Sequence, residues 1–494
     1  MELFGESSCA GCPGRRRNSF TAKKVPVPER SGSGAGRLAA RRCWDQPLAV
    51  QMCEPSWPGN RQARQAHLAE APPSHTWRGL SLFAPRSFAP RSFAPQSVCA
   101  SVCLRLSREL LGRHSDTGIG PVIVAGVNTS QPDESPEVRT ARLLRWQADA
   151  CRELGSPLYG DLLTRAAGDL VAGGPTAEVL RGHFDDRLSS VLALRLLGGV
   201  HALALSGRAP DLAAFYPSCG GTAESDQGSP RAWTALRRVL AEQGETVRGW
   251  LDRPPQTNEV GRAAALLGAL RHIAAESRLP IRLAEVGASA GLNLRADHFF
   301  VSGPAGWHGN PDSPVALTNG WLGSPLPVSQ IEVVDRTAGD LAPVDPMTDH
   351  GRLTLTAYVW PDQKDRLSRL RGAFVVARQV PADLRAESAS ATVARLKLEP
   401  GSWTVLWHSI FRQYLSDVQR AELAAGVAAL GAAATDSARF AYVYLEQSRA
   451  GGCPVTLTTW PGGYRRVLGA APAHGLPVRW HAQPEPGAER LRMS

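Results

Sequence analysis

The residues best suited to chemistry lie in one short segment, where an apolar run leads into a loop of small residues. The run covers residues 281–286 and contains Glu285 near its end, and Gly287-Ala288-Ser289-Ala290-Gly291 follows. Glycine lacks a Cβ atom, so a ligand can lie against the backbone, and a helix starting after the loop would face its polar groups. The segment predicts a strand, a ligand-binding loop and a helix; an ordinary tight turn is the simpler alternative.

This segment resembles the first motif of class I S-adenosylmethionine-dependent methyltransferases, in which a strand, an acidic residue and a Gly-x-Gly-x-Gly loop follow one another. Ser289 stands at the central glycine of that pattern. The resemblance implies S-adenosylmethionine as cofactor and transfer of its methyl group to an acceptor that the sequence does not identify. It implies that the cofactor contacts Glu285, Gly287, Ser289, Gly291 and Asn293.

The same five loop residues also match a nucleophile elbow, in which a serine occupies the strained turn of an α/β-hydrolase. Ser289 would then be the nucleophile of a serine hydrolase. Glu285 argues against this alternative, because a negative charge there would lie close to a developing oxyanion, which needs hydrogen-bond donors. In the usual chain order, the other members of the triad would be Asp335 or Asp340 and then His408 or His474.

Two further positions are candidates because polar residues follow predicted strands. A nucleotide-binding strand is expected to be followed by an acid at the end of the next strand, where it holds the ribose. Asp335, directly after residues 330–334, is the first candidate and Asp340 the second, although each could be a solvated turn acid. His408 follows residues 403–407 and could be a general base near the acceptor, or simply a histidine packed at the sheet edge.

The elements after Pro280 that would position these residues alternate between short apolar runs and helical stretches, which predicts a parallel sheet with crossover helices. We expect an α/β fold with a Rossmann-like, mostly parallel sheet of the methyltransferase type. The chain end predicts an antiparallel pair at the sheet edge. The predicted strands are residues 281–286, 331–334, 353–359, 403–407 and 440–445, and then 455–459 and 478–480 for the edge pair.

The region before Pro280 has helical periodicity almost throughout and predicts an all-α domain. Residues 188–205 are apolar nearly all round, which predicts a buried central helix. Gln256-Thr257-Asn258-Glu259 precedes the last helix and predicts an N-cap, with a lid over the pocket as the alternative. The expected boundaries are 1–121, 122–279 for the helical domain and 280–494 for the α/β domain.

The first 121 residues differ from the rest in charge. They hold 17 Lys+Arg against 8 Asp+Glu, whereas the other 373 residues hold 38 against 37. They show no periodicity, and the chain's 51 Arg against 4 Lys suggest a GC-rich genome, in which open reading frames often extend upstream. We therefore expect a low-complexity, disordered segment that reflects a mis-assigned start near Val122; a genuine basic tail is the alternative.

Composition excludes several classes of protein. No window of about 18 apolar residues occurs, so no membrane span is expected. The neutral body makes a nucleic-acid partner unlikely. The scattered thiols of the body are typical of a reduced cytoplasmic protein, and no metal is expected, because no periodic structure frames the N-terminal cysteines. The body cysteines are Cys151, Cys219 and Cys453, and the possible zinc ligands are Cys9, Cys12, Cys43 and Cys53.

Several segments together are similar to a bacterial family called domain of unknown function 2332. They run from about residue 138 to residue 480 in the family's order and leave residues 1–121 outside. The resemblance implies a family and not an activity, so a protein that binds a nucleotide-like ligand without catalysis, or acts as a scaffold, remains an alternative. The matching segments are residues 156–159, 256–262, 285–294, 340–346, 359–363, His408-Ser409 with Tyr414, and His474-Gly475.

Overall fold

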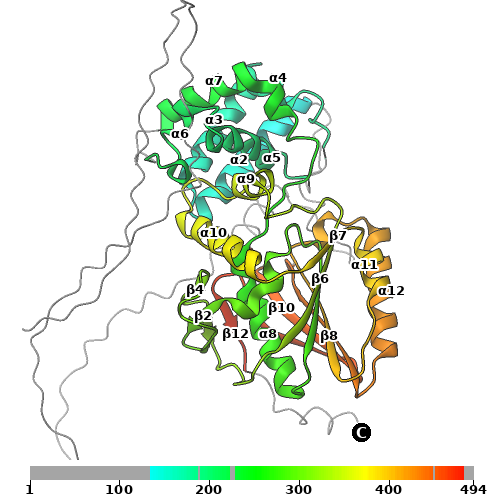
Figure 1. The fold of residues 1–494 in the computed structure, drawn as a ribbon. Helices are drawn as coiled ribbons and strands as arrows, with labels where there is room; N and C mark the ends of the chain where they lie inside the picture. Colours follow the sequence, from blue (N-terminus) through cyan, green and yellow to red (C-terminus); the bar gives the residue numbers. More distant parts are fainter. Residues whose placement is uncertain (1–133, 187–189, 223–228, 449–450, 483–494) are drawn as a thin grey trace, which may run out of the picture. The chain divides into compact units, whose positions relative to one another are not determined.

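The computed structural model describes residues 134–186, 190–222, 229–448 and 451–482. The N-terminal 121 residues, with their predicted disorder and their cysteines, lie outside these ranges. Every described element before residue 280 is a helix, and strands begin after it, so the predicted α/β class is confirmed (Figure 1). None of the described helices has the length and apolar character needed to cross a membrane.

The helical region packs around its own hydrophobic core. Proline at the first turn starts α2, α3 and α4, because its missing N–H is not needed there. The predicted central helix is α5, which begins at Leu192 and is buried nearly all round. The helices are α2 (Pro136–Glu153), α3 (Pro157–Val171), α4 (Pro175–Leu180), α5 (Leu192–Leu205), α6 (Pro210–Ala213), α7 (Ser229–Arg248) and α8 (Ala263–Glu276), with the short 3-10 turns η2 (Pro217–Cys219) and η3 (Val260–Arg262).

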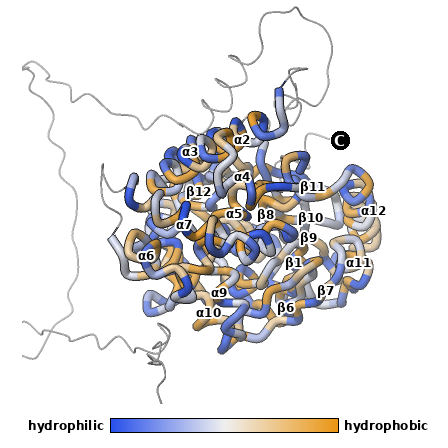
Figure 2. The backbone as a smooth tube through the Cα atoms, turned by 90° about the horizontal axis from the view of Figure 1, so that it is seen from above, coloured by the Kyte–Doolittle hydropathy of each residue, from blue (hydrophilic) through white to orange (hydrophobic). Residues whose placement is uncertain are grey.

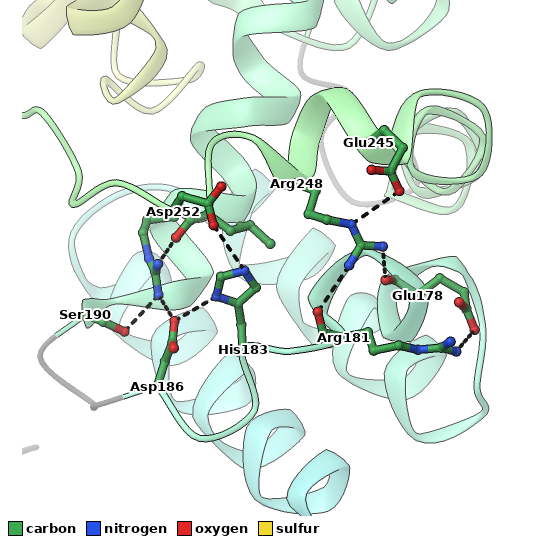
Figure 3. A network of polar contacts seen from close by, with 10 residues as sticks. Glu178, Arg181, His183, Asp186, Ser190, Glu245, Arg248 and Asp252 are labelled. Atoms are coloured by element: carbon green, nitrogen blue, oxygen red, sulfur yellow. Dashed lines mark hydrogen bonds and ion pairs between the residues drawn. The ribbon is translucent and has the colours of Figure 1, made fainter.

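A polar network ties the start of α5 to the segment after α7 (Figure 3). Arg195 is 5% exposed and donates to the Asp186 carboxylate, to the Leu251 carbonyl and, at 2.9 Å, to the Ser190 hydroxyl. His183 Nδ1 lies 3.1 Å from Asp186 Oδ2, the same oxygen that Arg195 contacts. Arg195 thus has an opposite charge and a carbonyl beside it, as expected of a structural network, although its Nε is without a hydrogen-bond partner.

Nine strands form one sheet in the order β5-β12-β11-β10-β9-β8-β1-β6-β7. The neighbours from β7 to β9 are parallel, and β10, β11 and β12 follow with antiparallel pairings. The strands are β1 (Ile281–Val286), β5 (Trp321–Gly323), β6 (Val333–Asp340), β7 (Asp383–Ala386), β8 (Ser402–Ser409), β9 (Ala438–Leu445), β10 (Cys453–Trp460), β11 (Tyr464–Ala471) and β12 (Val478–Trp480).

Helices cover both faces of the central strands, so these strands are buried on both sides, as in parallel sheets generally. α8 and α10 pack on one face, and α11 and α12 on the other (Figure 1). In β8 every residue from Ser402 to His408 is buried. Figure 2 colours the backbone by hydropathy, with hydrophobic residues in orange. The additional elements are α10 (Lys364–Gln379), α11 (Ala389–Arg395), α12 (Asp417–Ala433), η4 (Leu292–His298), η5 (Arg412–Tyr414) and a small sheet of β2 (Phe300–Gly303), β3 (Gly306–His308) and β4 (Ala316–Leu317).

Three predicted elements need correction. Residues 353–359 were expected to be a strand but lie mainly in helix α9 (Asp349–Ala357), which packs against α5. Thr348 caps this helix by accepting the Gly351 N–H, and so short an apolar run suits either structure. The strand predicted at 331–334 begins at Val333 and continues to Asp340. The C-terminal edge is not a single antiparallel pair, because β11 lies between β10 and β12 and β5 forms the outer edge.

Candidate functional site

The carboxyl ends of the parallel strands bring the candidate residues to one edge of the sheet. In chain order, the strands β7-β6-β1-β8-β9 are the third, second, first, fourth and fifth of the parallel set, so the order reverses between β1 and β8. Open α/β sheets bind ligands outside the strand ends at such a reversal. The loop after β1, Asp340 at the end of β6, and His408 at the end of β8 all lie there.

The loop after β1 turns through three residues with left-handed backbone conformations. Gly287, Ser289 and Gly291 have φ values of 65°, 54° and 61°. Glycine adopts this conformation freely, but a serine with a Cβ atom pays about 1 kcal/mol. Gly287 N–H donates to the Gly339 carbonyl at 2.9 Å, which ties the loop to the end of β6. The helix that follows is the 3-10 helix η4, with a bend at Arg295, and not a regular α-helix.

Asp340 is the acid that lies beside this loop. Its Oδ2 accepts the Ser289 N–H and its Oδ1 accepts the Ala342 N–H, both at 2.9 Å. A carboxylate has about four acceptor sites, so two remain for a ligand. Asp340 is half-buried, so a ligand can reach its carboxyl group.

Asp335, the first candidate for that role, lies elsewhere. It occupies the beginning of β6, where it pairs in register with Arg282 near the start of β1. The two side chains form an ion pair at 2.9 Å. Because β1 and β6 are parallel, Asp335 is at the end of the sheet opposite to the loop. The prediction that it closes the second strand is wrong, because that strand starts later and ends five residues further on.

Glu285 is buried near the end of β1, with 3% of its surface exposed. Burial raises the pKa of its carboxyl group to about 8, against the opposing effect of the nearby Arg295 guanidinium. The group is therefore mostly protonated at neutral pH. Its Oε2 makes no well-formed hydrogen bond, and the nearby Trp407 Nε1, which acts to lower the pKa, is likewise without one. Asn293, 1% exposed, donates to the Glu259 carbonyl at 3.3 Å, while its own Oδ1 is without a partner. Two buried polar atoms beside the loop are thus unsatisfied.

The polar segment 256–259 lies directly against the loop. Ser289 Oγ donates to Gln256 Oε1 at 2.8 Å, and the Leu292 N–H donates to Asn258 Oδ1 at 2.8 Å. The N-cap expected in this segment is Glu259, whose carboxylate accepts the Gly261 N–H at the start of η3. Asn258 thus occupies the Leu292 amide at the beginning of η4, whereas the helix after the loop was expected to face a ligand.

These contacts do not support a hydrolase triad that uses His408 as its base. Among the described residues, the Ser289 hydroxyl has Gln256 as its hydrogen-bond partner and no histidine. Asp340 binds the Ser289 backbone instead of orienting an imidazole. His408 is engaged with other partners, so the three residues do not form a triad.

His408 lies at the centre of a hydrogen-bonded relay at the ends of β8 and β9. It is fully buried, with Nδ1 at 2.8 Å from Glu446 Oε1 and Nε2 at 2.6 Å from the Tyr442 hydroxyl. Its ring stacks on Tyr444 with an interplanar angle of 5°. A carboxylate only accepts, so a neutral His408 donates from Nδ1 and accepts the Tyr442 O–H at Nε2. Both ring nitrogens of His408 are thus engaged, one by Glu446 and the other by Tyr442.

Glu446 is well suited to orient that histidine. Its Oε1 also accepts the N–H groups of Phe411 and Arg412 at 2.8 and 3.2 Å. Burial alone would raise the pKa of Glu446, but the hydrogen bonds from His408 and these amides outweigh burial and lower it. The carboxylate is therefore ionised and fixed. Tyr442 and Tyr444 lie in β9 and Glu446 follows it directly, and this alternate spacing was the signal that could have identified the relay from the sequence.

The turn after β8 covers part of the loop. A Cβ atom on Gly287 would lie 2.1 Å from Phe411 Cδ2, so the Phe411 ring packs on the glycine. Ile410, just before it, has a φ of 48°, which is rare for a β-branched residue. Ser289 and Ile410 place backbone strain on both sides of the β1–β8 reversal. Such strain concentrates at functional sites.

Hydrogen bonds connect the sequence segments that were grouped by family resemblance. Asp362 accepts the Ser156 hydroxyl at 2.7 Å. Arg366 of α10, which no sequence pattern indicated, donates to Glu259 Oε2 at 2.6 Å. Arg262 donates to the carbonyls of Ser409 and Ala473. These hydrogen bonds bring together segments about 200 residues apart in the chain.

Comparison with known proteins gave one match. The family described as "Uncharacterized protein conserved in bacteria (DUF2332)" matches residues 141–480. No curated protein and no solved structure matched the chain. Within the described residues, no group of three or more His, Cys, Asp and Glu side chains is arranged to hold a metal ion. Because the match covers well over half of the sequence, the chain belongs to this bacterial family, DUF2332.

Proposed function

We propose that the protein is a Rossmann-like, S-adenosylmethionine-dependent methyltransferase that uses the carboxyl edge of its sheet. One observation carries the proposal: Glu285 and Asp340 stand at the ends of adjacent parallel strands, on either side of a left-handed loop, where the strand order reverses. Rossmann-type sheets hold the nucleoside of a cofactor at this place, with an acid of the second strand on the ribose.

The residues present fit a nucleoside. Asp340 has acceptor sites left for two ribose hydroxyls. The unpartnered atoms of Glu285 and Asn293 lie beside the loop and could satisfy polar groups of the ligand. Phe411 packs on Gly287, so the ligand must lie against this ring or displace it. When bound, S-adenosylmethionine supplies an electrophilic methyl group, and the protein contributes mainly by positioning.

Tyr442 is the group that would handle the acceptor's proton. Its hydroxyl donates to His408 Nε2, and His408 in turn donates to Glu446. As the acceptor loses its proton to the Tyr442 oxygen, the Tyr442 proton moves to Nε2. The resulting imidazolium is stabilised by the Glu446 carboxylate. His408 therefore acts as a positioning and proton-holding residue behind the tyrosine.

Calorimetric titration of S-adenosylmethionine into the full chain tests the cofactor. We expect saturable binding that Asp340→Ala weakens about tenfold or more, since two charge-assisted hydrogen bonds are lost. Asp335→Ala is the matched control, because it removes an acid of the same strand at the opposite end of the sheet. Absence of binding by a folded sample, or equal loss in both variants, would contradict the proposal.

Ser289→Ala separates this proposal from the hydrolase alternative. A methyltransferase should retain cofactor binding, because Ser289 engages Asp340 through its backbone. A serine hydrolase would lose all reactivity toward a fluorophosphonate probe. Labelling of the wild-type chain by that probe, abolished in the variant, would favour the hydrolase.

A further inference from the structure

Three arginines and a histidine surround the buried carboxylate of Glu259, next to the candidate site. Arg366, 8% exposed at its side chain, donates to Glu259 Oε2 at 2.6 Å, and its guanidinium lies 5.5 Å above the Trp360 ring. Arg262 follows in η3, and Arg369 lies one turn further along α10 than Arg366. His474 packs on Trp360 with ring centroids 5.4 Å apart. We call these four residues, Arg262, Arg366, Arg369 and His474, the cationic cluster.

Two of these arginines have no ion-pair partner. Neither Arg262 nor Arg369 has a carboxylate of the described residues within 4.0 Å. Arg262 donates to two backbone carbonyls, and Arg369 has a buried Nε without any hydrogen-bond partner. Burial lowers the pKa of both guanidinium groups. Removing a cation from water without pairing it costs free energy, which a bound anion would offset.

Among the described residues, one carboxylate is in ion-pair contact with the cluster. Glu259 is paired with Arg366, whereas Glu446, which acts on Arg262 from beyond 4.0 Å, accepts hydrogen bonds from His408 and two amides. Asp365, which faces Arg369, is exposed on α10. Burial and the neighbouring Arg366 lower the pKa of His474 to about 3, so this ring is neutral and adds a hydrogen-bonding group without charge.

We propose that the cationic cluster binds the oxyanion, a carboxylate or a phosphate group, of a small-molecule ligand. Guanidinium groups present planar sets of donors that match the oxygens of both anions. Arg262, Arg369 and His474 are half-buried, so the cluster remains within reach of solvent. The Trp360 indole forms an apolar wall beside it.

The cluster adjoins the edge at which the strand order reverses. Arg262 Nη1 donates to the carbonyl of Ser409, the last residue of β8, at 3.3 Å. Glu259, which the cluster surrounds, holds Asn293 through its carbonyl. An anionic ligand there would lie beside the loop after β1, in a position to present the rest of its structure to that edge. Anion binding itself requires no methyl transfer.

The test is calorimetric titration of the full chain with inorganic phosphate and, separately, with acetate, in a buffer free of other oxyanions. We expect saturable binding of at least one anion, weakened about ten- to hundredfold by Arg369→Gln through loss of charge-assisted hydrogen bonds. The preferred anion distinguishes a phosphate-bearing from a carboxylate-bearing ligand. Arg369→Gln should fold, since no other residue depends on a hydrogen bond from that guanidinium.

Arg371→Gln is the matched control, because it removes an exposed arginine of the same helix and changes the net charge equally. It should leave anion affinity unchanged. Equal weakening in both variants, or no saturable binding of either anion, would overturn the proposal. Because no S-adenosylmethionine is present in this titration, failure of the cofactor proposal would leave the result standing.

Discussion

The helical region and the carboxyl edge of the sheet each contain a buried histidine, and the two histidines have different kinds of partners. In the helical region, His201 is fully buried, with Nδ1 at 3.0 Å from the Ala357 carbonyl and Nε2 at 2.7 Å from the Ser218 hydroxyl. At the sheet edge, His408 is equally buried but is bound to a carboxylate and a tyrosine. Burial lowers the pKa of His201 to about 4, so it is a neutral structural group.

Both regions hold imperfectly satisfied groups. In the helical region the buried Arg195 has an acid and a carbonyl as partners, although its Nε has none and Val191 has a φ of 46°. At the sheet edge, Glu285 has an unpartnered oxygen, and Ser289 and Ile410 adopt left-handed conformations. The edge differs in that these groups lie where the strand order reverses, which is where open α/β sheets bind ligands. The comparison therefore favours the sheet edge as the site of function.

The largest effect is expected from Arg195→Met in the helical region. The change leaves Asp186 and the Leu251 carbonyl without their partner, which should lower the free energy of unfolding by about 3–5 kcal/mol. Urea unfolding measures the loss. Arg181→Met, which removes an exposed arginine paired with Glu178, should cost less than about 1 kcal/mol. Equal stability of the two variants would mean that the buried contacts of Arg195 contribute no more to stability than an exposed ion pair does.

Glu285→Gln should raise the free energy of unfolding, by an amount that depends on pH. The folded-state pKa of Glu285 is raised from 4.5 to about 8, so the folded protein binds a proton that the unfolded chain releases between these values. Wild-type stability therefore falls as pH rises through this window, by about 3 kcal/mol at pH 7. The neutral glutamine lacks this loss, so the variant should gain stability relative to wild type from pH 5 to pH 8.

Urea unfolding at several pH values checks this prediction, with Glu399→Gln as a control at an exposed glutamate. A stability difference between the Glu285 variant and wild type that stays constant with pH would show that Glu285 is ionised in the folded protein.

Gly287→Ala tests the contact between the loop and Phe411. The added methyl group meets the phenyl ring and requires a left-handed alanine, so we expect a loss of about 2–4 kcal/mol. In a Phe411→Ala background the steric part should disappear, leaving about 1 kcal/mol of backbone strain. A double-mutant cycle from thermal or urea unfolding measures the coupling. Additive losses would mean that the ring does not rest on Gly287 in solution.

Glu446→Gln gives the smallest of these effects and probes the relay. The folded-state pKa of Glu446 is lowered, so its stabilising contribution is present above the unfolded pKa and is lost as pH falls through the folded value. The variant should lose about 1.5–3 kcal/mol at pH 7, typical of hydrogen bonds to a charged group, and less at pH 3. Tyr442→Phe should keep the pH dependence, because it leaves the Glu446–His408 bond intact. A loss for Glu446→Gln that does not change with pH would contradict an ionised Glu446.

Local patterns in the sequence were sufficient for several elements. The strand at 281–286 is β1 to the residue, and the runs at 403–407 and 440–445 lie within β8 and β9. The glycine spacing predicted the loop, and Gly287 and Gly291 do adopt the left-handed conformation that only glycine takes freely. These features depend on neighbouring residues along the chain, which is why they could be predicted.

The tertiary structure decided which residues meet. Strand β6 begins two residues later than predicted and extends to Asp340. Asp335 therefore lies at the end of the sheet opposite to the loop, and Asp340 lies beside the loop. This register is set by the pairing of β6 with β1. The run at 353–359 lies mainly in a helix that packs on α5. The local sequence pattern does not distinguish a helix from a strand in so short an apolar run. Arg366, Arg369 and Glu259 come together across more than a hundred residues of chain. Such contacts depend on packing between distant segments, and the periodicity of the sequence does not indicate which segments will pack together.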